Sequence, residues 1–474
     1  MQNAFLTAVP IFARFVCLIF VLFICFSPVA ALAQRCDIDA ETIYKLRPPA
    51  IGAYAIWYGV HGDEVHKDRY VSGVLHEENG HIMVAGTRSS LGMPYPQLVL
   101  SEVDRRGRVV TEVTRKVRNL KKVLDVKQSG EGMLVTALVS DRADKQAFWV
   151  GVFNRDGVFE RENTFKSSTG APVVFGDALP TADGKKFVMV LETRDKQSGE
   201  TRLSEFYRLN GKLKVISRRT YNPGPDNGFH SIVPLKDGSF LISGYIDNDF
   251  SRKTGWLLKV DEHGSIIWQR SYPRGISAKF AKTAEMPDGL LIAAGIALPA
   301  EEDPAKAGWV IAVMPDNGEV VWQRYFTGKV DYAAKDINIS EDGLISLVLD
   351  AKPIKASQEE NGEPDQDYVR LMTLNPRGVI FDSQAFFQGE IADAQSMILG
   401  PAKERILIGY TQIAYQKENV EMSGSDKGEG MKKDMGGETV TRSDEGWIVA
   451  APRAEKYEHP CAPKVLRELG DLEL

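Results

Sequence analysis

The chain has few cysteines and no excess of positive charge, and these two shortages exclude several classes of protein. Four Cys in 474 residues exclude a disulfide-dense miniprotein. Fifty-eight Lys and Arg stand against 64 Asp and Glu, so the charge does not favour a nucleic-acid binder. The hydrophobic content of 43% is that of an ordered globular protein, which excludes an intrinsically disordered chain.

The N-terminal apolar run, Phe15 to Phe26, is twelve residues long and therefore shorter than the span of about 20 that a membrane helix needs. Arg14 precedes it, and Ala31-Leu32-Ala33 supplies the small residues of a signal-peptidase site. Residues 1–33 are therefore predicted to be an export signal. The first mature residue would be Gln34 rather than the Cys of a lipid anchor, so we expect a product without a membrane anchor, periplasmic or secreted.

Cleavage would remove two of the four cysteines and leave Cys36 and Cys461, one near each end of the mature chain. Disulfides persist in exported proteins, so we expect a bridge between them. Two free thiols and a reactive pair are the alternatives, although the spacing is not that of a C-x-x-C motif.

Two near-copies of one segment, Gly255 to Arg270 and Gly308 to Arg324, show that the mature chain is repetitive. Each copy is predicted to be a strand, a Gly-containing turn and a strand. An Asp-Gly pair between apolar runs lies upstream of each copy, at Asp237-Gly238 and Asp288-Gly289, and predicts a further hairpin because Gly adopts positive φ at low cost.

Sliding this four-strand template along the chain gives seven units of roughly 50 residues. The glycine of the first hairpin falls at Gly80, Gly132, Gly184, Gly238, Gly289 and Gly343, and a degenerate seventh copy has Glu404 there. Four antiparallel strands per unit, repeated radially, predict an all-β fold: a seven-bladed β-propeller.

The last unit ends after its third strand, and residues 55–60 read like the missing fourth strand. The N-terminal strand is therefore predicted to complete the last blade. This gives a single propeller domain over residues 34–461, followed by a C-terminal tail over 462–474. A bridge between Cys36 and Cys461 would lie where the ring closes.

The turn-and-strand pattern of two blades resembles the repeats of secreted bacterial β-propellers and, more distantly, the quinoprotein-like (PQQ-like) repeat, in which Asp and Gly in a turn precede a Trp. The matching residues are Asp261, Gly264 and Trp268, then Asp316, Gly318 and Trp322. The resemblance implies the fold and says little about activity, because propellers host enzymes, scaffolds and adhesins alike.

The sequence nominates no catalytic residues and no metal ligands. His76 and His81 are five residues apart around Asn79-Gly80, which predicts a turn rather than a zinc-binding helix. There is no G-x-S-x-G elbow and no phosphate-binding glycine loop. The resemblance to quinoproteins makes a quinone-dependent enzyme the principal catalytic alternative, although those proteins have eight blades and adjacent cysteines that this chain lacks. No cofactor is assigned.

Asp125, Asp177 and Asp336 fall at the same place in three first strands, seven residues before the predicted hairpin glycine. First strands line the central channel of a propeller, so these carboxylates are candidate ligands for a molecule or cation there. The alternative, which we favour, is that each accepts hydrogen bonds from nearby backbone.

The longest predicted loops lie on the face that also carries the connections between blades, and they are acidic. Segments 299–307, 353–367 and 416–445 have net charges of −2, −4 and −3. A basic patch is expected on the same face. The candidate partner-binding residues are Lys116, Arg118, Lys121, Lys122, Glu359, Glu360, Asp365 and Asp367.

These observations favour an exported, monomeric and non-catalytic platform that binds an envelope protein or an extracellular ligand through its loops. A quinone- or metal-dependent periplasmic enzyme with its site in the channel is the first alternative. An envelope-assembly scaffold is the second.

Overall fold

The computed structural model describes the chain from Ala40 onward, within one compact unit that extends to Leu474. The described residues are 40–47, 49, 52–63, 65–141, 145–194, 202–247, 252–299, 305–354, 366–416, 440–454 and 472–473. The predicted export signal, Cys36 and Cys461 lie outside them, so the bridge stays a prediction. Among the described residues, no helix is long and apolar enough to cross a membrane.

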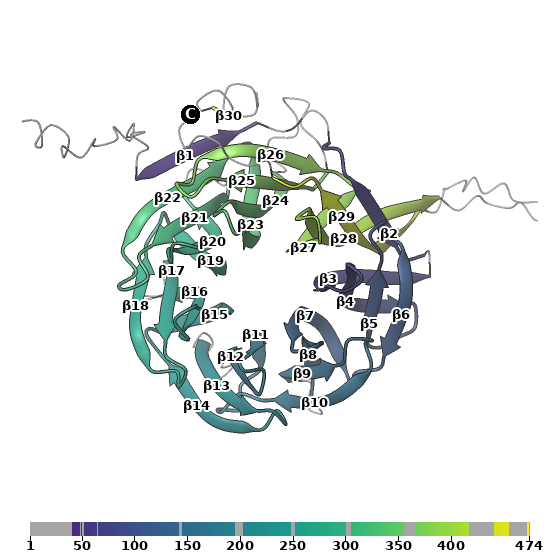
Figure 1. Ribbon diagram of the computed structural model, residues 1–474, viewed down its shortest axis with the longest axis horizontal. Helices are drawn as coiled ribbons and strands as arrows, with labels where there is room; N and C mark the ends of the chain where they lie inside the picture. Colours follow the sequence, from purple (N-terminus) through teal and green to yellow (C-terminus); the bar gives the residue numbers. More distant parts are fainter. Residues whose placement is uncertain are drawn as a thin grey trace, which may run out of the picture. The chain divides into compact units, whose positions relative to one another are not determined.

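The described strands form seven antiparallel sheets arranged in a ring, which confirms the predicted seven-bladed propeller (Figure 1). Blades are numbered here by their order along the chain. Blade one contains β3(His66–His76), β4(His81–Ser90), β5(Gln97–Val103) and β6(Val109–Arg115). Blade two contains β7(Leu120–Ser129), β8(Gly132–Ser140), β9(Gln146–Phe153) and β10(Phe159–Phe165). Blade three contains β11(Val173–Pro180), β12(Lys186–Arg194), β13(Arg202–Asn210) and β14(Val215–Tyr221).

The remaining blades repeat this order of strands from the centre of the ring outward. Blade four contains β15(Asp226–Pro234), β16(Phe240–Asp247), β17(Lys253–Val260) and β18(Ile266–Tyr272). Blade five contains β19(Ser277–Glu285), β20(Leu291–Leu298), β21(Ala307–Val313) and β22(Val320–Thr327). Blade six contains β23(Val330–Ile339), β24(Ile345–Pro353), β25(Tyr368–Leu374) and β26(Ile380–Phe386). Blade seven contains β27(Ile391–Leu399), β28(Arg405–Gln416), β29(Val440–Ala451) and β2(Trp57–His61).

The N-terminal strand β2 closes the ring, as the sequence predicts. It pairs antiparallel with β29, with Trp57 opposite Ala450 and His61 opposite Gly446. Blade seven is therefore built from both ends of the described chain, so the first and last repeats cannot separate without breaking one sheet.

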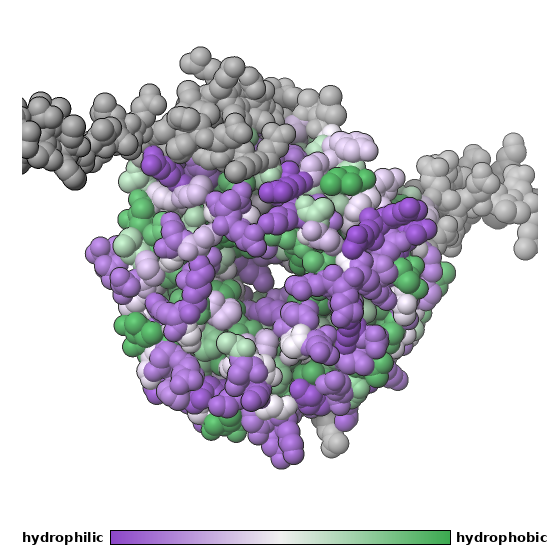
Figure 2. Space-filling view, in the orientation of Figure 1, coloured by the Kyte–Doolittle hydropathy of each residue, from purple (hydrophilic) through white to green (hydrophobic). Residues whose placement is uncertain are grey.

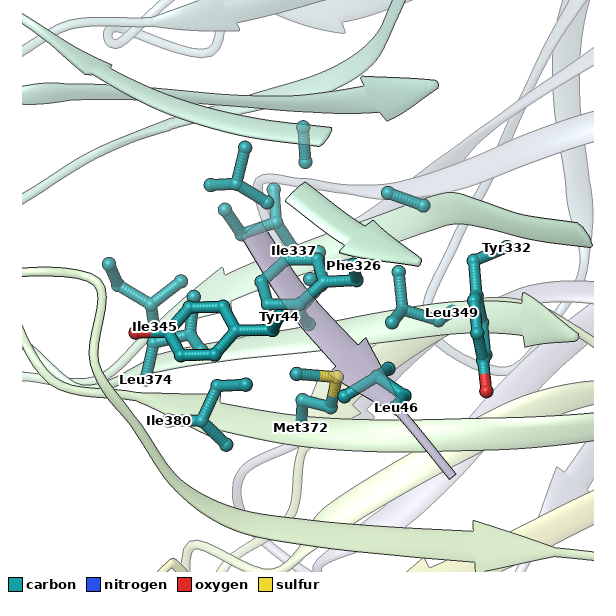
Figure 3. Close-up of a cluster of buried hydrophobic side chains, with 14 of the residues drawn as sticks. Tyr44, Leu46, Phe326, Tyr332, Ile337, Ile345, Leu349, Met372, Leu374 and Ile380 are labelled. Atoms are coloured by element: carbon teal, nitrogen blue, oxygen red, sulfur yellow. The ribbon is translucent and has the colours of Figure 1, made fainter. Parts of the chain in front are cut away.

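Strand β1(Glu41–Leu46) is a feature that the repeat template does not predict. It pairs in parallel with the outer strand β22 of blade five, from Glu41 opposite Gln323 to Lys45 opposite Thr327. The two-residue strand β30(Leu472–Glu473) pairs with β1 in turn. Tyr44 and Leu46 are buried in a hydrophobic cluster of blades five and six (Figure 3). The N-terminal segment therefore contacts blade five through β1 and completes blade seven through β2.

Two of the predicted turn positions are wrong by one or two residues. In blade two the positive φ belongs to Gly130, whereas Gly132 begins β8, because the hairpin there has only two residues between paired positions. In blade seven it belongs to Lys403 rather than Glu404. The other predicted glycines, Gly80, Gly184, Gly238, Gly289 and Gly343, have positive φ.

The predicted loop 416–445 is shorter than expected, because its last six residues belong to β29. They continue the ladder with β28 as far as the pair Gln416 and Val440. The segment is polar, but blade one provides partners: the Arg69 guanidinium lies 2.7 Å from Asp444, and Ser443 Oγ donates to the carbonyl of His66 at 3.0 Å. Tertiary contacts therefore extend a strand that composition alone does not reveal.

Candidate functional site

The innermost strands place one polar side chain of each blade at an equivalent position around the central channel. In six blades this residue follows a β-bulge directly, and in blade three it lies two residues further on. We call these residues the channel ring: Ser72, Asp125, Asp177, Ser231, Lys282, Asp336 and Ser396. Figure 2 shows the opening at the centre, with hydrophilic side chains around it.

Lys282 reaches across the channel and joins blades that are not neighbours in the ring. Its Nζ lies 3.4 Å from Oδ2 of Asp125, which belongs to blade two, while Lys282 belongs to blade five. Lys127 Nζ lies 3.7 Å from the same oxygen and also bonds Oδ1 of Asp177 in blade three. Lys282, Asp125, Lys127 and Asp177 therefore form a series in which cations and carboxylates alternate.

The charges in the channel shift one another's proton affinities. Burial acts to lower the pKa of Lys282, but the carboxylates of Asp125, Asp336 and Asp177 outweigh it and raise the pKa. Burial acts to raise the pKa of Asp125, yet Lys282 and Lys127 hold it below its ordinary value. Burial dominates at Asp336 and raises its pKa, against the opposing effect of Lys282. Lys282 thus stays protonated as the common counter-ion of three carboxylates.

The three aspartates predicted from sequence also accept backbone hydrogen bonds. Asp177 Oδ2 accepts from the N–H of Ile232 in the next blade at 3.1 Å, and Asp336 Oδ2 accepts from Met397 in the next blade at 2.7 Å. Asp125 Oδ1 accepts from the adjacent Val126 at 2.8 Å. These contacts fit the backbone-bonding alternative, because the carboxylates have partners within the protein. In the described part of the chain, no three His, Cys, Asp or Glu side chains are grouped so that they could hold a metal ion.

A second group of charged residues, which we call the mouth cluster, lies nearer the crossover face, the face that carries the connections between blades. Its members are Lys335 of β23, Asp350 and Lys352 of β24, Asp367, Asp393 of β27 and Tyr410 of β28. Asp350 pairs with Ala333 near the start of β23, where the chain enters blade six from blade five. The cluster therefore joins blades six and seven at the mouth of the channel.

Asp350 is the most deeply buried carboxyl group of this cluster. Lys335 Nζ and Lys352 Nζ lie 3.5 and 3.4 Å from its Oδ2. Its Oδ1 has no hydrogen-bond partner among the described residues, although only 3% of Asp350 is exposed. Burial, followed by the charge of Asp393, raises the pKa of Asp350 to about 6, and the two lysines oppose this only in part.

The other two carboxylates of the mouth cluster also have partners. Asp393 Oδ2 accepts a hydrogen bond from the Tyr410 hydroxyl at 3.2 Å, and its Oδ1 lies 3.8 Å from Lys335 Nζ. Asp367 Oδ2 lies 3.8 Å from Lys352 Nζ. The Arg69 guanidinium of blade one lies 4.6 Å from the centroid of the Tyr410 ring. The cluster thus continues into blade one.

Blade three has a carboxylate at the position of Asp350, and there both blades can be compared. Glu192 holds the equivalent position in blade three, since Glu192 and Asp350 lie two residues after the strand partners of Asp177 and Asp336. Glu192 Oε1 accepts a hydrogen bond from the Tyr245 hydroxyl at 3.2 Å. A neighbouring blade can therefore supply such a donor, but for Asp350 Oδ1 none of the described residues does.

The predicted partner-binding residues lie in different surroundings. Lys116 and Arg118 are exposed on the connection between β6 and β7, and Lys121 Nζ lies 5.0 Å from the centroid of the Tyr95 ring. Lys122 is exposed near the start of β7, and burial of its ammonium group and then the charge of Lys335 lower its pKa. Asp367 belongs to the mouth cluster. Glu359, Glu360 and Asp365 lie outside the described residues.

Sequence reasoning missed Lys282 and Asp350. The spacing rule that selects the aspartates also predicts Lys282, because this residue lies seven residues before Gly289. No sequence pattern predicts Asp350, because it follows no turn or motif. Its importance comes from burial beside another blade.

Comparisons with known proteins give no family for this chain. No protein-family model matches it, and no curated protein matches it. Similar solved structures include the Dos1 propeller (8% identity, TM-score 0.44, covering 84% of this chain and 96% of that one). They also include the periplasmic gluconolactonase PpgL of Pseudomonas aeruginosa (11%, TM-score 0.46, covering 82% and 100%). A third is the quinohemoprotein alcohol dehydrogenase ADHIIG of Pseudomonas putida HK5 (9%, TM-score 0.43, covering 88% and 80%). Similarity at this level carries no argument about activity.

Proposed function

We propose that the protein is an exported binding platform, and that its ligand or partner contacts the crossover face at the mouth cluster. The observation that carries this proposal is Asp350, a buried carboxyl with one oxygen to which no described residue donates a hydrogen bond. A buried acceptor without a donor costs about 1–3 kcal/mol, so a molecule that supplies the donor gains that energy on binding.

The carboxylates of the mouth cluster already have cations beside them, since Lys335 and Lys352 lie 3.4–3.8 Å from Asp350, Asp367 and Asp393. What Asp350 Oδ1 lacks among the described residues is a hydrogen-bond donor rather than a counter-ion. A hydroxyl or amide N–H group of a polar ligand, or of a protein loop, satisfies that need.

Asp350→Asn is expected to stabilise the free protein and weaken ligand binding. The folded-state pKa of about 6 exceeds the ordinary value of 3.8, so the favourable contribution of Asp350 is complete below pH 4 and is lost as the pH rises through 6. The groups that face it are Lys335, Lys352, Asp367 and Asp393. At pH 8 the free energy of unfolding of the variant should therefore be about 1–2 kcal/mol higher than that of wild type. At pH 4 the two free energies of unfolding should be equal.

Native mass spectrometry of protein purified gently from its own cell envelope measures the expected loss of ligand binding. Wild type should retain a non-covalent mass that the Asp350→Asn variant loses. Asp156→Asn, an exposed change on the opposite face, should retain it. Equal retention by the Asp350→Asn variant would show that the ligand does not bind at the mouth cluster.

A further inference from the structure

A pocket of about 290 Å³ lies between blades three and four, on the face opposite the crossovers. We call this the hairpin face, because it is formed by the turns between the first and second strands and between the third and fourth strands of each blade. Phe187, Val188 and Phe240 provide apolar walls. The charged residues that line the pocket are two cations, Arg208 and Lys186, and two carboxylates, Asp183 and Glu262. This volume is close to the lower limit for small-molecule sites, so it suits a ligand of few atoms.

Arg208 has no hydrogen bond or ion pair with any described residue, although it is partly buried. It lies in β13 opposite Val188 of β12. It shares a face of the strand with Phe206, which packs in the core between blades three and four. A guanidinium carries five N–H donors, so this side chain brings a positive charge, paired with none of the described residues, to a pocket whose walls are mainly apolar.

Blade four contains the same arrangement with the charge satisfied. Lys259 is opposite Leu241, at the position equivalent to Arg208. Its Nζ lies 2.7 Å from Oδ2 of Asp237 in the hairpin turn and donates to the carbonyl of Pro315 at 3.2 Å. The propeller can therefore pair a cation at this position with the Asp of its own blade's turn.

Blade three has an Asp at the corresponding position, Asp183, but this carboxylate bonds residues of its own turn rather than Arg208. Its turn has six residues between the paired positions Pro180 and Phe187, whereas blade four has five between Pro234 and Phe240. Asp183 Oδ1 accepts hydrogen bonds from Thr181 Oγ1 at 2.6 Å and from the Lys185 N–H at 3.0 Å, and its side chain is exposed. Asp183 and Arg208 therefore do not form an ion pair, although both residues line the pocket.

We propose that this pocket binds a small molecule with an apolar body and a carboxylate group, the carboxylate on Arg208 and the body against Phe187, Val188 and Phe240. A carboxylate matches the two parallel N–H donors of a guanidinium, and the apolar walls gain free energy from burial of hydrocarbon. The site is independent of the function proposed above, because it lies on the other face and in other blades.

Calorimetric titration of the mature protein with octanoate and with 1-octanol tests the proposal, since the two probes share a chain length and differ in charge. Octanoate should bind at least tenfold more tightly than octanol, which corresponds to about 1.4 kcal/mol. Arg208→Gln should remove this preference and leave octanol binding unchanged. Because Arg208 has no partner to lose, the variant should melt at the wild-type temperature.

Two further variants test whether the charge of Arg208, rather than any charge near the pocket, determines octanoate binding. Ala182→Glu places a negative charge at the exposed rim and should weaken octanoate binding but not octanol binding. Lys186→Gln removes an exposed rim charge and should change octanoate affinity less than Arg208→Gln does. The proposal is overturned by equal affinities for the two probes, by an unchanged Arg208→Gln variant, or by octanoate binding weaker than about 1 mM.

Discussion

Replacing Lys282 with methionine is expected to lower the free energy of unfolding by about 3 kcal/mol at pH 7. The change keeps much of the side chain's length and removes the charge that Asp125, Asp177 and Asp336 share. Asp336 then loses the charge of Lys282, while Asp125 and Asp177 keep only Lys127. The expected loss is at the lower end of the range for a broken buried ion pair, because 27% of the Lys282 side chain still reaches solvent.

A pair on the surface provides the matched control for this prediction. Lys306 Nζ lies 2.7 Å from Asp331 Oδ2, closer than Lys282 is to Asp125, but the Lys306 side chain is half-exposed. Lys306→Met should cost less than about 1 kcal/mol in the same urea titration. Adding Asp125→Asn to Lys282→Met should restore part of the stability, since it removes one unpaired charge. Equal small losses in both methionine variants would refute a stabilising role for the channel ring.

Truncation of Tyr44 or Leu46 to alanine is expected to destabilise the protein by about 3 kcal/mol each. Both side chains are buried against blades five and six, and the Tyr44 ring stacks on Phe326 with centroids 5.8 Å apart. Figure 3 shows both residues pointing from β1 into this cluster. The loss combines the transfer of apolar surface to water with the cavity that remains.

Ile43 is the internal control, because it lies between Tyr44 and Thr42 on the same strand and is 49% exposed. Ile43→Ala should change stability by less than about 0.5 kcal/mol. Thermal unfolding of the three variants measures the difference. If Tyr44→Ala and Leu46→Ala unfold like Ile43→Ala, then β1 does not stabilise blade five.

The fold could be predicted from sequence because its information is local and repeated. Asp-Gly turns such as Asp237-Gly238 and copied strands such as Trp256 to Val260 mark each hairpin independently, and their regular spacing counts the blades. Strand β1 has no such mark. Its partner β22 is about 280 residues away, and the pairing depends on a surface that exists only once blades five and six have formed.

The candidate sites were harder to predict for a related reason. Repeat position identified Asp125, Asp177 and Asp336, but their partners Lys127 and Lys282 depend on which blades face one another across the channel. Asp350 Oδ1 and Arg208 are notable because no described residue forms a hydrogen bond with them, and a missing hydrogen bond has no sequence pattern. For both residues, the equivalent position in another blade shows what a satisfied arrangement looks like.

Site-specific photocrosslinking in the cell envelope tests most directly the claim that function lies on the crossover face. A photoreactive residue would replace Lys352 in the mouth cluster and, separately, Asp156 on the hairpin face. We predict a discrete adduct from position 352, none from position 156, and loss of the adduct when Asp350→Asn is added. An adduct from position 156 alone, or one from position 352 that persists in the Asp350→Asn background, would contradict the proposed binding site.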